Sequence, residues 1–205
     1  MSSVLKHKLQ RTARVALTAA LAVLSALQLS SCKEQDNAVD EYPNWQATND
    51  RFVASLASDS VGQPGWQRFK AWTLAPKYEG DANSYVYVKV IESGDPAGTL
   101  PLANDSVSIT YSARLLPSVS YPQGRVVDQS YVGSAYIQGV SSPQNSNVNT
   151  YQVGFATALM NMRDGDHWLV YVPYALGYGT TDYNSVPAYS TMVFDLRLHS
   201  HWHKQ

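Results

Sequence analysis

The sequence predicts an α+β fold, in which a bent antiparallel β-sheet wraps around one short α-helix and a helical extension precedes the sheet. Several runs in the second half of the chain alternate apolar and polar residues with period two, which is typical of antiparallel strands with one buried face. One segment among them carries an apolar stripe at helical spacing. The residues ahead of position 84 show helical spacing or no clear period.

The first 32 residues are typical of an export signal. A basic stretch up to Arg14 precedes fifteen residues, 15–29, that are dominated by Ala, Leu and Val, and this run is shorter than the ~20 residues that span a bilayer. The only cysteine, Cys32, follows the sequence LSS, and LSSC resembles the lipobox of bacterial lipoproteins, in which the cysteine is lipidated. We therefore expect residues 1–32 to be a lipoprotein signal that ends at the lipidation site Cys32. A soluble secreted protein with a chance cysteine is the alternative.

Residues 33–83 are expected to be a tether followed by a helical extension. The stretch 33–41 is polar and charged, as in flexible linkers. Residues 44–58 place three large apolar side chains close to one helical face, with Asn44 as the N-cap. These side chains are Trp45, Phe52 and Leu56. Glycine and proline punctuate residues 59–83, which we predict to be irregular, with at most a short helix.

Residues 84–205 are expected to form the main domain. The runs with alternating pattern are 84–91, 105–115, 166–173 and 191–198. Ahead of the third run, an apolar stripe at i, i+3, i+4 and i+7 predicts a helix that ends near Gly165. The stripe consists of Phe155, Ala158, Leu159 and Met162. Because a helix of about two turns is marginal alone, the sheet should cover its apolar face.

The charge distribution argues against nucleic acid as a partner. After the first 32 residues the chain has 11 basic against 16 acidic residues, a net charge of −5. Affinity for phosphates comes from clustered lysine and arginine, which this balance does not provide.

Five motifs follow one another in the second half of the chain. Residues 111–115 read YSARL, 127–130 read VDQS, 154–165 read GFATALMNMRDG, 172–179 read VPYALGYG and 186–195 read VPAYSTMVFD. In this order they resemble Y-x-G-x-L, F-D-x-S, G-W-x-x-A-L-x-x-M-x-x-G, I-P-x-x-L-A-Y-G and I-P-P-x-x-x-L-x-F-D of the FKBP family of peptidyl-prolyl cis-trans isomerases. The signal and the helical extension resemble the exported bacterial lipoprotein branch of that family.

The resemblance implies a set of site residues. The catalytic residues would be Tyr111, Asp128 and Tyr178. The residues that would bind it are Val127, Gln152, Phe155, Val186 and Phe194, with Phe155 as the pocket floor and the Gln152 backbone N–H as a second donor beside the Tyr178 hydroxyl. Val127 and Phe155 replace the family's phenylalanine and tryptophan. Tyr111 and Phe194 have a structural alternative, because both would be buried in any alternating strand.

By the same resemblance, we expect a peptidyl-prolyl isomerase that acts on X-Pro bonds of exported proteins and assists their folding, anchored in the envelope of a Gram-negative bacterium. Its partners would be proline-containing polypeptides, no cofactor would be needed, and binding of immunosuppressant-type macrolides stays open. The alternative is a non-catalytic protein-binding module with the same fold. The altered residues Val127 and Phe155 keep this alternative open.

The chain ends with three histidines at period two. His199, His201 and His203 would share one strand face and could hold zinc. No carboxylate or cysteine ligand is near them in the sequence, so we favour a solvated chain end and expect no metal site.

Overall fold

The computed structural model describes residues 39–203. The predicted signal, Cys32 and the first part of the tether lie outside the described residues. Within residues 39–203, every helix is too short or too polar to cross a bilayer.

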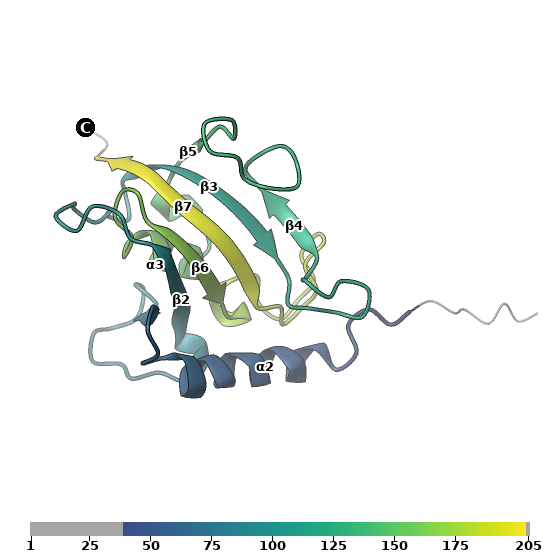
Figure 1. Ribbon diagram of the computed structural model, residues 1–205. Helices are drawn as coiled ribbons and strands as arrows, with labels where there is room; N and C mark the ends of the chain where they lie inside the picture. Colours follow the sequence, from purple (N-terminus) through teal and green to yellow (C-terminus); the bar gives the residue numbers. More distant parts are fainter. Residues whose placement is uncertain (1–38, 204–205) are drawn as a thin grey trace, which may run out of the picture. The chain divides into compact units, whose positions relative to one another are not determined.

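The core of the molecule is an antiparallel sheet with strand order β1-β2-β6-β7-β3-β4, and β5 pairs with β3 beside β4 (Figure 1). The strands are β1 (Trp66–Lys70), β2 (Tyr85–Glu92), β3 (Ser106–Arg114), β4 (Val126–Gln129), β5 (Gln144–Asn147), β6 (His167–Val172) and β7 (Met192–Trp202). The four runs with alternating pattern correspond to β2, β3, β6 and β7. Their predicted strand character is confirmed.

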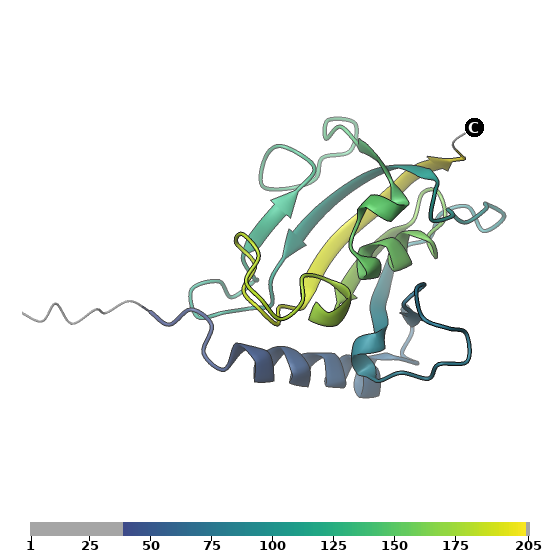
Figure 2. The same cartoon turned by 180° about the vertical axis from the view of Figure 1, so that it is seen from behind.

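The short helix α3 (Val153–Leu159) lies across one face of the sheet (Figure 2). Its residues from Gly154 to Leu159 are all buried, because they pack against the inward side chains of the strands. A Cβ on Gly154 would come within 2.3 Å of the Val172 side chain, so glycine permits this close approach. The helix ends at Leu159, earlier than predicted, and Gly165, with φ of 89°, lies instead in the turn before β6.

The helical extension is also present. Helix α2 (Trp45–Ser55) continues into a π-helical turn, η2 (Leu56–Ser60), and lies along the end of the sheet in both views (Figures 1 and 2). The prediction for Asn44 was only half right: this residue stands at the N-cap position, but it is left-handed, with φ of 51°, and its side chain makes no capping hydrogen bond.

The segment 59–83, predicted as irregular, contains strand β1, so that prediction was wrong for five residues. β1 pairs with β2 and extends the sheet to the N-terminal side of residue 84. On one face Phe69 stacks on Trp168 with ring centroids 5.7 Å apart, and on the other Trp66 stacks on Tyr171 at 5.5 Å. The remaining short helices are η3 (Ala82–Ser84), η4 (Val148–Thr150) and η5 (Tyr174–Leu176).

The three C-terminal histidines do not all share one strand face as expected: the ring centroids of His201 and His203 lie 6.4 Å apart, but a register shift separates both from His199. The register of β3 and β7 shifts at His199, because Ile109 pairs with Leu198 while the preceding residue of β3 pairs with Ser200. The histidines have separate partners: His199 with Thr110 at 3.0 Å, His201 with Asp164 at 2.7 Å and His203 with Asp105 at 2.6 Å. Within the described part of the chain, no group of three or more His, Cys, Asp or Glu side chains could hold a metal ion.

Candidate functional site

A cavity of about 210 Å³ lies between the N-terminal end of α3, the strands β3, β4 and β7, and the loop after β6. It is lined by Tyr111, Asp128, Thr150, Tyr151, Gln152, Phe155, Val172, Gly177, Tyr178, Met192 and Phe194. Six of these were expected site residues: Tyr111, Asp128, Gln152, Phe155, Tyr178 and Phe194. The chain therefore brings together side chains that are up to 83 positions apart in the sequence.

Aromatic rings form the apolar part of the cavity. Phe155, which is only 3% exposed, contacts Tyr111 and Phe194 edge to face, with centroid distances of 5.5 and 4.8 Å. Tyr151 lies on its other side at 4.6 Å. Edge-to-face contacts stabilise each ring in one orientation, so the rings form a fixed apolar surface on one side of the cavity.

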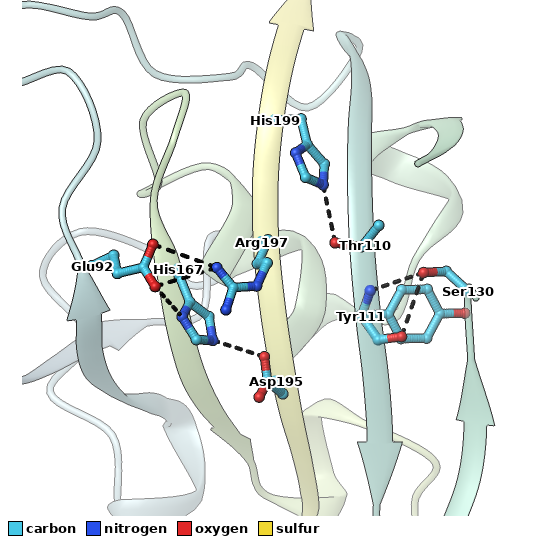
Figure 3. Close-up of polar contacts among 8 residues, drawn as sticks. All are labelled: Glu92, Thr110, Tyr111, Ser130, His167, Asp195, Arg197 and His199. Carbon is cyan, nitrogen blue, oxygen red and sulfur yellow. Dashed lines mark hydrogen bonds and ion pairs between the residues drawn. The ribbon is translucent and has the colours of Figure 1, made fainter. Parts of the chain in front are cut away.

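The phenol of Tyr111 and the carboxylate of Asp128 form the polar rim. Tyr111 Oη donates a hydrogen bond of 2.7 Å to Asp128 Oδ2. Burial and this hydrogen bond raise the pKa of Tyr111, so its hydroxyl remains a protonated donor. Ser130 follows Asp128 by two residues, and its hydroxyl accepts a hydrogen bond from the Tyr111 N–H at 2.9 Å (Figure 3). The Ser130 N–H donates to the Tyr111 carbonyl at 3.0 Å. These contacts fix Asp128 relative to the cavity.

Tyr178 has a hydroxyl group that no residue between 39 and 203 engages in a hydrogen bond. Its ring stacks on Tyr183 with centroids 5.1 Å apart. The loop is held by a hydrogen bond from the Gly179 N–H to the Tyr174 carbonyl at 2.9 Å, and Gly179 takes a φ of 81° that favours glycine. Burial and the nearby charge of Asp128 raise the pKa of Tyr178, so its hydroxyl stays protonated and able to donate, and the residue lines the cavity.

Gln152 provides a second free donor. It stands at the N-cap of α3 in an extended conformation, with ψ of 150°, and its carbonyl accepts the Ala156 N–H at 2.9 Å. Its own backbone N–H has no acceptor among the described residues, and the residue lines the cavity. The cavity therefore combines an aromatic surface with two unpaired donors.

Residues 98–199 match the family described as FKBP-type peptidyl-prolyl cis-trans isomerase. The chain belongs to the FKBP family through this domain. The crystal structures of a peptidyl-prolyl cis-trans isomerase from Pseudomonas syringae and of FkpA from Escherichia coli both match with a TM-score of 0.55, at 22% and 19% identity. The first match covers 76% of this chain and 92% of that one, and the second covers 98% and 73%. The predicted FKBP-like α+β fold is thus confirmed.

The chain also matches sequence relatives over part of its length. The chain is 32% identical over 99 residues to the macrophage infectivity potentiator of Trypanosoma cruzi. The matched segment covers 48% of this chain and 44% of the relative. It is 29% identical over 125 residues to the FKBP-type 22 kDa peptidyl-prolyl cis-trans isomerase of Escherichia coli, 60% of this chain and 53% of the relative. It is 35% identical over 98 residues to the peptidyl-prolyl cis-trans isomerase Mip of Coxiella burnetii, 48% of this chain and 36% of the relative. The chain thus spans about half or less of the length of these relatives.

Two expected wall residues of the FKBP domain lie outside the cavity. Val127 and Val186 line a neighbouring pocket of about 340 Å³, which shares only Asp128 and Tyr178 with the cavity. Val127 directly precedes Asp128 on β4, and its side chain therefore points to the other face of the strand. The contact of these two valines with a substrate, expected from the resemblance, stays a prediction.

Five further residues complete the walls and were not among the expected site residues. They are Thr150, Tyr151, Val172, Gly177 and Met192. A signal existed for Met192, because it lies two positions before Phe194 and alternate residues of a strand share a face. Val172 pairs directly with Met192 across β6 and β7, so the same face includes it. Tyr151 directly precedes Gln152, which was an expected site residue, so its neighbour in the sequence was the available signal.

On the opposite face of β7 from Phe194, the FKBP domain carries a polar network (Figure 3). His167 Nε2 lies 2.8 Å from Asp195 Oδ1, and His167 Nδ1 lies 3.4 Å from Glu92 Oε1. Arg197 approaches the same glutamate at 3.4 Å. Burial alone would raise the pKa of Asp195, but the hydrogen bond and charge of His167 lower it below its ordinary value. The network links β2, β6 and β7 and does not contact the cavity.

Proposed function

We propose that this chain is a peptidyl-prolyl cis-trans isomerase that binds the proline of its substrate in the cavity described above. The observation that carries the proposal is the combination of an aromatic surface with two hydrogen-bond donors, Tyr178 Oη and the Gln152 N–H, that have no partner in the described part of the chain. The FKBP-type domain and the peptidyl-prolyl cis-trans isomerases among the relatives of the chain support the same activity.

The reaction requires no nucleophile. The X-Pro amide must rotate through a twisted state that loses its resonance, against a barrier of about 18–20 kcal/mol. The twisted amide is less polar than the planar one, so an apolar cavity that excludes water favours the twisted state over the solvated ground state. Lowering the barrier by roughly 6 kcal/mol would accelerate rotation about 10⁴-fold. The rings of Tyr111, Phe155 and Phe194 would provide this surface.

Polar groups at the rim would orient the peptide. Tyr178 Oη and the Gln152 N–H would each donate to a substrate carbonyl and hold the chain on both sides of the rotating bond. Asp128, held by Tyr111, would lie beside the twisting carbonyl and disfavour its planar orientation by charge repulsion. Each of these contacts acts only on a correctly placed substrate, which supports catalysis by positioning.

Exported polypeptides that contain proline are the proposed substrates, and assistance to their folding is the proposed role. The export signal and the LSSC sequence support a lipid anchor at Cys32 in the envelope of a Gram-negative bacterium. Labelling of cells with an alkyne fatty acid should mark the wild-type chain and leave Cys32→Ser unmarked. Equal labelling of both would refute the anchor without affecting the proposed activity.

A protease-coupled assay on a series of X-Pro peptides tests the activity. A rate above background that falls when Asp128 is replaced by alanine would support the isomerase. The replacement of the family's tryptophan by the smaller Phe155 favours the second candidate, a non-catalytic binding module. A folded protein that accelerates no peptide in the series, but binds proline-containing chains in calorimetry, would establish that candidate instead. Titration with an immunosuppressant-type macrolide in the same calorimeter would decide whether the cavity accepts this ligand.

A further inference from the structure

The start of helix α2 contacts the segment that leads into β7. The side chain of Asn49 is fully buried, and its Oδ1 accepts a hydrogen bond of 2.6 Å from the Thr191 N–H. Its Nδ2 donates to the Trp45 carbonyl at 2.8 Å, which fixes the orientation of the amide. Asn49 thus satisfies a backbone donor 142 positions away. A buried amide with both groups paired across such a separation determines one geometry, because any shift would leave a buried donor unsatisfied.

Thr191 is adjacent to the cavity in the chain. The next residue, Met192, and its alternate neighbour, Phe194, both line the cavity. The hydrogen bond from the Thr191 N–H to Asn49 therefore fixes the backbone directly before the cavity wall that Met192 and Phe194 form.

Trp45 makes a second contact with the same segment. Its Nε1 donates to Ser190 Oγ at 2.8 Å, and Ser190 Oγ in turn donates to the Pro187 carbonyl at 2.7 Å. The Trp45 ring packs against Tyr42 with centroids 4.7 Å apart. These contacts hold the turn before β7 in place.

The residues just before α2 contact the loop between β3 and β4. The Glu41 carboxylate accepts hydrogen bonds from Ser118 Oγ at 2.5 Å and from the Ser120 N–H at 2.9 Å. The Arg125 guanidinium lies over the Tyr42 ring at 5.8 Å and donates to the Ser185 carbonyl. The loop between β3 and β4 leads to the strand that carries Asp128. The Ser185 carbonyl belongs to the loop that follows Tyr178.

We propose that residues 41–49 are a brace for the candidate active site, and that Asn49 and Trp45 are positioning residues for the cavity wall at the start of β7. The inference rests on the proposed function for its kinetic consequence, but the effect on the cavity is independent of it. The two residues do not touch the cavity; they act through Ser190 and Thr191.

The test compares three variants of the full chain. Asn49→Leu removes the acceptor of the Thr191 N–H at similar size, and Trp45→Phe removes the donor to Ser190 while it keeps an aromatic ring. Val53→Ala is the matched control. Val53 is equally buried on the same helix but packs against Leu56 and Tyr87, away from the cavity. All three substitutions should lower stability. Each variant is therefore measured without denaturant, at a temperature at which its urea unfolding curve shows that it is folded.

The first readout is the methyl resonance of Met192 in protein labelled at its four methionines. We expect this resonance to shift in Asn49→Leu and Trp45→Phe and to stay in place in Val53→Ala. The second readout is kcat/KM per folded molecule, which we expect to fall about tenfold to a hundredfold in Asn49→Leu, as is typical of a misplaced wall, and to remain near wild type in the control.

The outcomes separate the brace from the activity. A Met192 resonance that does not move in either test variant, or that moves equally in Val53→Ala, overturns the brace. A wild-type chain without isomerase activity overturns the proposed function, and the Met192 resonance then still decides the brace. If Asn49→Leu does not fold, Trp45→Phe carries the same test.

Discussion

Phe155 offers the sharpest test of the apolar cavity, because it contacts three other aromatic rings and forms the cavity's inner surface. In Phe155→Leu the aliphatic burial is largely kept, whereas the ring contacts with Tyr111, Tyr151 and Phe194 are lost. Aromatic pairs contribute about 0.5–1.5 kcal/mol each beyond burial, so we expect the free energy of unfolding to fall by about 2–3 kcal/mol. A domain with about 5–15 kcal/mol of stability stays folded after such a loss.

The same substitution should reduce catalysis more than stability alone explains. A smaller side chain widens the cavity and admits water, which removes part of the preference for the twisted amide. We expect kcat/KM per folded molecule to fall at least about tenfold, which corresponds to about 1.4 kcal/mol of transition-state stabilisation. Urea unfolding with an unchanged m value would establish the loss of stability, and the protease-coupled assay would give the rate.

Leu198→Ala is the control for this prediction. Leu198 is buried on β7 but does not line the cavity, and its truncation should cost about 2–5 kcal/mol of stability. Its kcat/KM per folded molecule should remain near wild type. Wild-type kcat/KM in Phe155→Leu, or an equal loss in both variants, would refute the role given to the aromatic surface.

Three further predictions follow from single contacts. Asp128→Ala should lower kcat/KM about tenfold and Tyr178→Phe only about threefold, because the first removes a charge and the second one neutral hydrogen bond; the reverse order would contradict the roles proposed for them. Gly154→Ala should lower the urea midpoint, with a loss of about 1–3 kcal/mol, because its methyl group would overlap the Val172 side chain; an unchanged midpoint would show that α3 can move. The fold lowers the pKa of Asp195 below the value of about 3.9 that the residue has in the unfolded chain. Its carboxylate therefore stabilises the folded protein fully at a pH above that unfolded pKa, and this contribution is lost as the pH falls through the folded pKa. Asp195→Asn should therefore flatten the acid limb of a plot of urea midpoint against pH, and an unchanged acid limb would argue against the contact with His167.

The sequence predicted those elements whose burial follows a simple period. Strands β2, β3, β6 and β7 place apolar residues on the core at alternate positions, such as Val107 and Ile109 of β3 or Leu196 and Leu198 of β7. β5 has the sequence QNSN and β1 the sequence WQRFK, and neither has this alternation, because both lie at an edge of the sheet and are held by pairing with one neighbour. Backbone pairing without an apolar pattern leaves no periodic signal to detect.

The family motifs predicted part of the candidate site. Phe155 and Tyr178 stand within motifs and line the cavity, whereas Val127 also stands within a motif but lies in the neighbouring pocket. Tyr151 lies outside the five motifs, so its place beside Phe155 depended on a loop path that no local rule specifies. Asn49 was beyond prediction, because its hydrogen bond to Thr191 joins two segments that only the folded chain brings together.

The sheet terminates in strands of only five residues at β1 and four residues each at β4 and β5. Short edges offer few free backbone groups to an incoming chain, which limits aggregation through strand addition. An isomerase of the proposed kind would meet this hazard with every extended, partly folded polypeptide. Contact through a proline ring in a cavity, instead of through a growing ladder of main-chain hydrogen bonds, allows such a chain to be released and to continue folding.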